Sequence, residues 1–193
     1  DKWLTCRHAW HQTSGGDEIA ANRHRARLSA MFAWAVHREL VSRTPFRREG
    51  VSTKILRYAE HERYRRLVGD EELRLLEHAG PHLRDLIVAA LATACRVGEL
   101  LSLQWSQVHV PKRQIHLPGR KTKSSRDRMI PVVSNSLLKI LVARQKDPDG
   151  DGYPVSAYVF GDVTGGRVRS IKTSWRATCR RAGINNLHFH DLR

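Results

Sequence analysis

The spacing of apolar residues in this chain changes from the period of a helix to that of a strand and then back. A stripe at intervals of three and four predicts one amphipathic helix. Its residues are Leu83, Leu86, Ile87, Ala90 and Leu91. Residues 108–110, 115–117 and 129–133 are instead short, alternating or β-branched runs between turn residues, which is typical of an antiparallel sheet. Helical spacing returns after Ser134 and again over about 170–182. We therefore predict a mainly α-helical fold with a small antiparallel β-sheet, an α+β class.

A separate helical segment precedes this region. The pattern from Asp17 to Leu40 is helical, and Pro45 ends it because proline disfavours a helical residue before it. Residues 47–57 are polar and basic and contain a glycine, so we interpret them as a linker. We predict a domain boundary near residue 55, with the end of one helical domain over 1–54 and a second domain over 55–193.

The charge of the chain predicts a polyanionic partner. Lys and Arg number 34 against 19 Asp and Glu, and the formal net charge is +15. Nucleic acid, an anionic membrane surface and an acidic protein would all be attracted. The longest apolar stretch, Leu86 to Cys95, is about half of the ~20 residues that span a bilayer. We therefore expect no membrane partner.

Two segments concentrate this charge. Residues 111–128 contain seven basic residues opposed by one acid, and residues 167–181 contain six basic residues and no acid. Segments without compensating acids favour contact with the DNA backbone over an ordinary solvated surface. The residues that we expect to contact DNA are Arg120, Arg126, Arg128, Arg169, Lys172 and Arg176.

The cysteines and the N-terminus bear on where the protein works. Cys6, Cys95 and Cys179 are odd in number, far apart and without a C-x-x-C pair, which predicts reduced thiols rather than disulfides or a zinc site. The chain starts at Asp1 with neither a signal peptide nor a methionine, so we expect it to begin inside a longer protein. The expected location is cytoplasmic and associated with the nucleoid.

Two short motifs carry residues suited to a DNA phosphate. Arg96 precedes Glu99 by three residues, and His190 precedes Arg193 by three. A guanidinium group can bind two phosphate oxygens at once and stabilise negative charge in the transition state. A His side chain can transfer a proton, and a carboxylate can orient an Arg. Arg96 alone would most often be a surface partner of Glu99. His188 and His190 lack a convincing third ligand, so no metal site is expected.

Three motifs together resemble one family. Residues 93–105, TACRVGELLSLQW, closely resemble the first arginine motif of the tyrosine recombinases, or phage integrases. Residues 122–132 are similar to the lysine hairpin of this family, and residues 187–193 resemble its His-x-x-Arg motif. Asn22 to Pro45 is similar to the last helix of the core-binding domain. The resemblance covers nearly the whole chain and implies a truncated catalytic domain over 55–193 after the end of a SAM-like core-binding domain over 1–54.

The resemblance also implies roles for individual residues. Arg96 and Arg193 would hold the scissile phosphate, with Glu99 in support. His190 would assist proton transfer at the nucleophile. A hairpin lysine would be the general acid for the 5′-hydroxyl leaving group. Lys123 fits this role better than its rival Lys121, because its distance to the strand-ending proline matches the family without a gap.

The family implies a reaction as well as a site. Its members break and rejoin DNA through a 3′-phosphotyrosyl intermediate, without metal or nucleotide cofactor, as tetramers on double-stranded DNA. Their nucleophilic Tyr follows His-x-x-Arg, whereas Tyr58, Tyr64, Tyr153 and Tyr158 all precede Arg193. We therefore expect the parent protein to be a site-specific recombinase or integrase of a mobile element, and this chain to bind DNA without cutting it. The alternatives are a non-catalytic DNA-binding truncated integrase and an enzyme similar to type IB topoisomerases.

Overall fold

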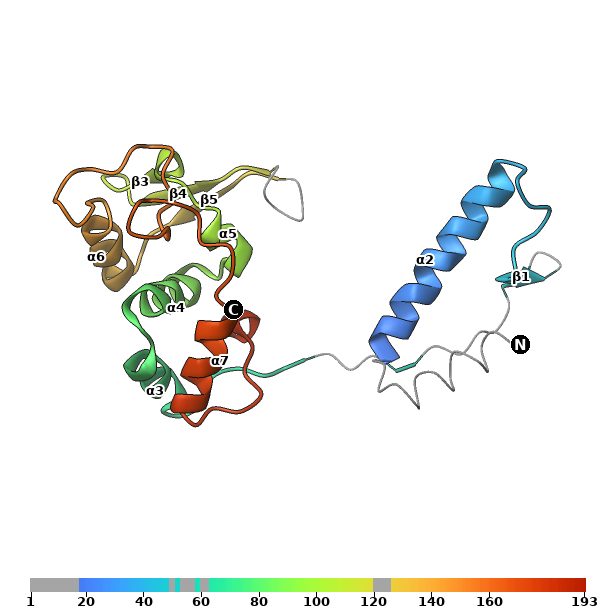
Figure 1. Cartoon of the computed structure of the whole chain (residues 1–193), viewed down its shortest axis with the longest axis horizontal. Coiled ribbons are helices and arrows are strands. Elements are labelled where there is room, and N and C mark those ends of the chain that lie inside the picture. The colour runs from blue at the N-terminus through green and yellow to red at the C-terminus, as the bar shows by residue number, and fades with distance from the viewer. Residues whose placement is uncertain (1–17, 49–50, 53–57, 60–62, 120–125) are drawn as a thin grey trace. The chain divides into compact units, whose positions relative to one another are not determined.

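The computed structural model describes residues 18–48, 51–52, 58–59, 63–119 and 126–193. The chain divides into two compact units, Asp1–Arg63 and Tyr64–Arg193, which follow one another along the colour scale of Figure 1. The predicted boundary near residue 55 lies outside the described residues. The assignment of 1–54 to the end of a core-binding domain therefore stays a prediction.

The first unit contains a long helix and a short hairpin. Helix α2 is Glu18–His37, close to the predicted span. Strands β1 (Arg47–Arg48) and β2 (Val51–Ser52) pair antiparallel, so part of the predicted linker forms a ladder, because backbone pairing does not require apolar side chains. The Asn22 side chain donates to the Tyr58 carbonyl at 2.9 Å and accepts the Tyr58 N–H at 3.1 Å. These two bonds fasten the chain after the hairpin to the helix.

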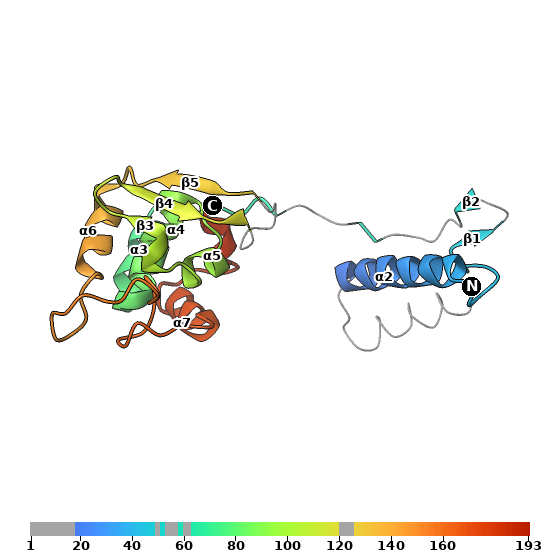
Figure 2. The ribbon, with the colours of Figure 1, turned by 90° about the horizontal axis from the view of Figure 1, so that it is seen from above.

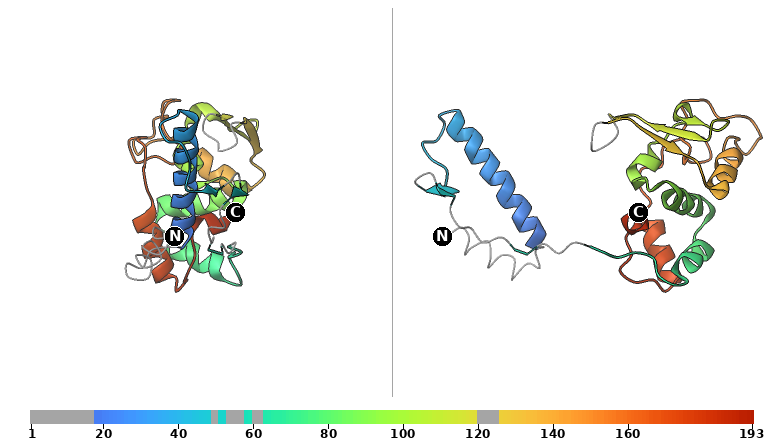
Figure 3. Two further views of the ribbon diagram at one scale, coloured as in Figure 1. Left: turned by 90° about the vertical axis from the view of Figure 1, so that its right-hand side faces the viewer. Right: turned by 180° about the vertical axis from the view of Figure 1, so that it is seen from behind.

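The second unit confirms the predicted fold class. Its helices are α3 (Glu71–His78), α4 (Pro81–Thr93), α5 (Val97–Leu101), α6 (Asn135–Ala143) and α7 (Lys172–Arg181), with 3-10 turns η1 (Trp105–Gln107) and η3 (Phe189–Leu192). Helix α4 is central and packs against α5, α6 and η3, while α3 packs against α7. Figures 1 and 3 show the sheet on one side of α4 and the α3–α7 pair on the other. None of the described helices is both long enough and apolar enough to cross a membrane.

Helix α4 forms where the apolar stripe predicts it and ends at a sharp turn. Pro81 occupies its first turn, where a missing N–H costs nothing. Leu83, Leu86 and Ile87 of the stripe are buried in the core. The helix ends at Ala94, which adopts a left-handed conformation with φ of 51° and donates its N–H to the Ala90 carbonyl at 2.8 Å. This turn lets the chain start α5 immediately after α4.

The small sheet has the order β3-β4-β5 and is antiparallel throughout. Its strands are β3 (Val108–His109), β4 (Gln114–Leu117) and β5 (Arg128–Pro131). Figure 2 shows the three strands next to one another. Strand β5 begins one residue before the predicted start, and Arg128 pairs with Leu117. Because side chains alternate along a strand, Arg128 shares the less exposed face with Ile130, while Met129 is exposed.

The central position of α4 makes a direct prediction for stability. We expect Leu86→Ala, at a fully buried position of α4, to lower the free energy of unfolding by about 2–5 kcal/mol, because it leaves a cavity in a close-packed core. The matched control is Leu73→Ala in α3, where the side chain is 69% exposed, and its effect should stay within about 0.5 kcal/mol. Urea denaturation of both variants measures the difference. Equal losses would contradict the described packing.

Candidate active site

The turn between α4 and α5 positions the first arginine and its acid. Arg96 is the N-cap of α5, and its backbone N–H donates to Glu99 Oε2 at 2.8 Å. Its Nη1 also donates to Glu99 Oε1 at 3.1 Å. The Glu99 side chain is 4% exposed, whereas that of Arg96 is 40% exposed. The pair is therefore not an ordinary surface salt bridge, because a buried carboxylate holds a guanidinium that still reaches solvent.

A second guanidinium reaches the same carboxylate from the sheet. Arg128, the first residue of β5, places Nη2 at 2.8 Å from Glu99 Oε1. The contact is an ion pair, and it helps to lower the pKa of Glu99. Arg128 Nε and Nη2 are both shielded from solvent. This pairing was not predicted from the sequence, where Arg128 was assigned to DNA contact.

The C-terminal motif reaches this place on the 3-10 turn η3. Trp175 of α7 donates its indole N–H to the Leu187 carbonyl at 3.1 Å and packs edge-on against Phe189, with ring centroids 5.0 Å apart. The buried carboxylate of Asp191 accepts the N–H of His188 at 2.7 Å and caps the turn. With these anchors buried, His190 in η3 remains exposed and Arg193 half-buried.

A cavity of about 340 Å³ joins the two arginine motifs. It is lined by Cys95, Arg96, Val97, Gly98, Glu99, Phe189 and His190. Burial raises the pKa of the Cys95 thiol, while the positive charges of Arg128 and Arg193 act in the opposite direction. Arg193 directly follows η3, and its N–H donates to the His190 carbonyl at 3.3 Å. The fold brings Arg96, Glu99, Arg128, His190 and Arg193 into one neighbourhood.

The base of the predicted lysine hairpin is braced by one carboxylate. Asp127 accepts the N–H of Gly119 at 2.6 Å and lies 3.2 Å from His116 Nε2. The Gly119 hydrogen bond is the main cause that lowers the pKa of Asp127, and His116 adds to it. These contacts join the two ends of the hairpin. Arg120, Lys121 and Lys123 lie outside the described residues, so the choice between the two lysines stays a prediction.

The remaining predicted DNA contacts are on the surface. Arg126, Arg169, Lys172 and Arg176 are exposed, as contact with a phosphate backbone requires. Arg128 differs from them, because its charge faces Glu99. In the described part of the chain, no three His, Cys, Asp or Glu side chains are grouped as metal ligands.

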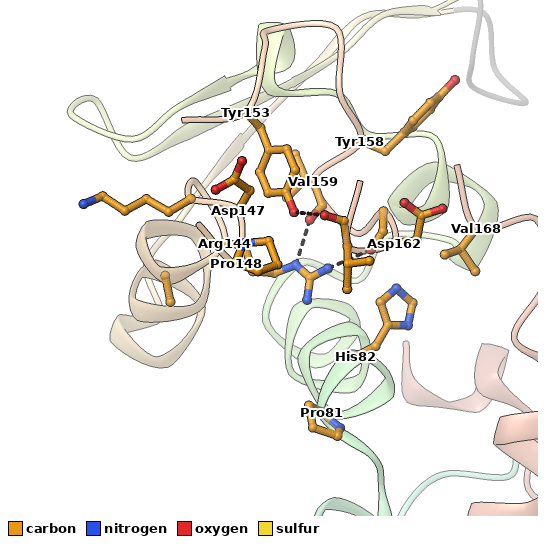
Figure 4. Close-up of a pocket in the computed structure, with 14 residues that line it drawn as sticks. Pro81, His82, Arg144, Asp147, Pro148, Tyr153, Tyr158, Val159, Asp162 and Val168 are labelled. Atoms are coloured by element: carbon orange, nitrogen blue, oxygen red, sulfur yellow. Dashed lines mark hydrogen bonds between the residues drawn. The ribbon is translucent and has the colours of Figure 1, made fainter. Parts of the chain in front are cut away.

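A larger cavity, of about 620 Å³, lies between α6 and the loop around residues 158–163. Figure 4 shows Arg144 inside it, with Nε donating to the Val159 carbonyl at 2.8 Å. Its Nη2 donates to the Gly161 carbonyl at 3.0 Å, and its Nη1 binds Asp85 at 2.9 Å. Each nitrogen of this guanidinium group therefore already donates a hydrogen bond to another residue of the protein. The smaller cavity is the better candidate site, because Arg96, which lines it, bonds through Nη1 to Glu99 and is still 40% exposed, so its other nitrogens can bind a ligand.

The chemistry of the smaller cavity suits an anionic ligand. Two guanidinium groups, those of Arg96 and Arg128, contact one buried carboxylate, which leaves an excess of positive charge. Burial by itself would raise the pKa of Glu99, but the hydrogen bonds from Arg96 and the contact with Arg128 hold it below its ordinary value. Glu99 therefore stays ionised and keeps Arg96 oriented, while the remaining N–H groups can bind phosphate oxygens.

Known proteins are similar in sequence to most of this chain. The family model described as "Phage integrase family" matches residues 65–193. The shufflon-specific DNA recombinase of Escherichia coli is 33% identical over 134 residues, which cover 68% of this chain and 31% of that protein. The integrase of Salmonella phage P22 is 25% identical over 147 residues, which cover 69% of this chain and 36% of that protein. The chain thus spans about a third of the length of these curated relatives.

Solved structures show the same fold at lower identity. A lambda integrase dimer bound to a COC′ core site matches 99% of this chain and 69% of its own, with a TM-score of 0.72 and 17% identity. A lambda integrase tetramer bound to a Holliday junction matches 99% of this chain and 56% of its own, with a TM-score of 0.67 and 19% identity. At these identities the likeness establishes the fold alone.

The lowered pKa of Glu99 predicts how stability depends on pH. A carboxyl group with a depressed folded-state pKa stabilises the fold above its unfolded pKa, and this stabilisation is lost as the pH falls through the folded value. We therefore expect wild type to be more stable than Glu99→Gln at neutral pH, with the difference shrinking under acid. Urea denaturation between pH 7 and pH 3 measures this, with the exposed Glu77→Gln as control. A difference that does not change with pH would contradict an ionised, paired Glu99.

Proposed function

The chain belongs to the phage integrase family, and from this premise we propose that its protein is a site-specific DNA recombinase or integrase. It cuts and rejoins DNA strands through a 3′-phosphotyrosyl intermediate. The observation that carries the proposal is the cavity where the Arg96 motif and the His190 motif meet, although about ninety residues separate them in the sequence. The names of the curated relatives, a recombinase and an integrase, support the same activity.

In this proposal each residue has a defined task. Arg96 and Arg193 bind the non-bridging oxygens of the scissile phosphate and stabilise the charge of the transition state. Glu99 orients Arg96, and His190 assists proton transfer at the attacking oxygen. Lys123, in preference to Lys121, protonates the leaving 5′-hydroxyl. The phosphotyrosyl bond conserves the energy of the broken linkage, so the reaction requires no metal or nucleotide.

The proposed partner is double-stranded DNA, and the proposed working assembly is a tetramer in the cytoplasm, on the nucleoid. The charge of +15 supports a polyanionic partner. The lambda integrase structures with this fold include a dimer on a core site and a tetramer on a Holliday junction. For the 193-residue chain by itself we propose DNA binding without cleavage, because its four tyrosines all precede Arg193, whereas the family nucleophile follows this motif.

A nicked suicide substrate tests the activity of the full-length protein. We expect wild type to trap covalent protein–DNA complex and Arg96→Ala to do so at least about 100-fold more slowly, because it loses a transition-state donor. The matched control is Arg84→Ala, an exposed arginine near the other end of α4, which should trap DNA at the wild-type rate. Equal trapping by wild type and Arg96→Ala would overturn the role of Arg96. Relaxation of supercoiled DNA without a partner site would indicate a topoisomerase instead.

Salt dependence tests DNA binding by the chain itself. Each phosphate contact contributes about −0.9 to the slope of log K against log salt. We expect a steep slope for wild type and a decrease of about one in its magnitude for each of Arg169→Ala, Lys172→Ala and Arg176→Ala. Fluorescence anisotropy with a duplex between 50 and 300 mM salt measures the slopes. A nearly flat wild-type dependence would contradict a backbone-binding function.

A further inference from the structure

We infer that Arg128 is a positioning residue of the phosphate site, which fixes Glu99 and, through it, Arg96. The inference rests on the proposed function and deepens it. Arg128 belongs to a basic run whose other members lie on the surface or outside the described residues, and from the sequence it reads as one more contact with the DNA backbone. Its surroundings in the fold point to a different task.

The first observation is a shared oxygen. Glu99 Oε1 lies 3.1 Å from Arg96 Nη1 and 2.8 Å from Arg128 Nη2, while Oε2 accepts the Arg96 backbone N–H at 2.8 Å. One buried carboxylate therefore joins the N-cap of α5 to the first residue of β5. Neither arginine can shift without changing the position of the acid that orients the other.

The second observation is the direction in which the Arg128 side chain lies. Strand alternation turns Arg128 to the same face as the partly buried Ile130. Its Nε and Nη2 atoms are shielded from solvent, and the side chain is 34% exposed. A residue whose task is backbone contact presents its donors to solvent, as the exposed Arg169 and Arg176 can. Arg128 instead places its charge beside Glu99.

The third observation is the balance of charge. A buried carboxylate requires compensation, because an unpaired charge is costly to bury. If Arg96 supplied all of it, its guanidinium would be committed to Glu99. Arg128 provides a second positive charge, so the three groups carry a net charge of +1 that remains available for a phosphate. Burial raises the pKa of Glu99, and the Arg128 contact is one of the causes that lower it, after the hydrogen bonds from Arg96.

The fourth observation concerns the neighbouring residue. Asp127 joins the hairpin ends through Gly119 and His116, and the next residue along the chain contacts Glu99. Two adjacent residues, Asp127 just before β5 and Arg128 at its start, thus connect the hairpin base to the arginine site. In the sequence the two candidate lysines precede Arg128 by five and seven residues. Arg128 therefore sets where the return strand of the lysine hairpin meets the phosphate site.

The experiment compares Arg128→Met and Arg128→Lys with wild type in the full-length protein. For Arg128→Met we expect a Kd for duplex DNA within about twofold of wild type, an unchanged salt slope, and a trapping rate at saturating DNA lower by roughly ten- to a hundredfold, because a small misplacement of a site is that costly. Arg128→Lys keeps the charge and should recover part of the rate. Arg169→Met is the reference for a backbone contact, with weaker binding and a smaller slope. If Arg128→Met instead behaves like Arg169→Met and keeps its rate at saturation, the inference is overturned.

A second measurement does not depend on cleavage. In the 193-residue chain, NMR titration should show a higher pKa for the Glu99 carboxyl in Arg128→Met and a smaller rise in Arg128→Lys. Urea denaturation of Arg128→Met, Glu99→Gln and the double variant should show coupling between the two sites. An unchanged Glu99 pKa or strictly additive effects would overturn the inference. A wild-type protein that traps no DNA would overturn the proposed function alone, since the titration and the mutant cycle would still decide the role of Arg128.

Discussion

The candidate site depends on one buried carboxylate. Glu99, in the first turn of α5, accepts the N–H and guanidinium of Arg96 and lies beside Arg128 of the sheet. A carboxylate that is almost fully buried keeps its charge only if donors surround it. The two arginines meet this requirement, and in doing so they are held in fixed positions. The acid that the site must neutralise is therefore also the group that organises it.

The surrounding fold brings the rest of the site to this acid. Helix α4 contacts α5, α6 and η3, and its left-handed end at Ala94 starts α5 with only a short turn between the two helices. On the other side, the indole of Trp175 and the cap at Asp191 fix the turn that carries His190. Mobile loops would not give such placement, since phosphoryl transfer relies on prior positioning of charge. Burial of the anchors leaves the side chains of the candidate site at the cavity.

The size of a cavity does not identify the site in this protein. The larger cavity contains Arg144, whose three nitrogens are all bonded to the fold. The smaller one is lined by Arg96, whose guanidinium bonds through Nη1 to Glu99 and is still 40% exposed. A ligand gains little from a donor that is already hydrogen-bonded within the fold and more from one that is still available. The state of the donors therefore decides between the two cavities.

The sequence by itself determined the fold class, the main helices, the three short strands and the resemblance of three motifs to phage integrases. These follow from the periodicity of apolar residues and from the spacing within motifs, both of which are local properties of the sequence. It did not determine the partner of Arg128, because the contact joins β5 to a residue of α5 that is distant in the sequence. Nor did it predict the contacts of Asp127 with Gly119 and His116 at the hairpin base, or the position of Cys95 at the cavity. Only the tertiary structure decided these, since contacts between residues distant in sequence depend on how the elements pack.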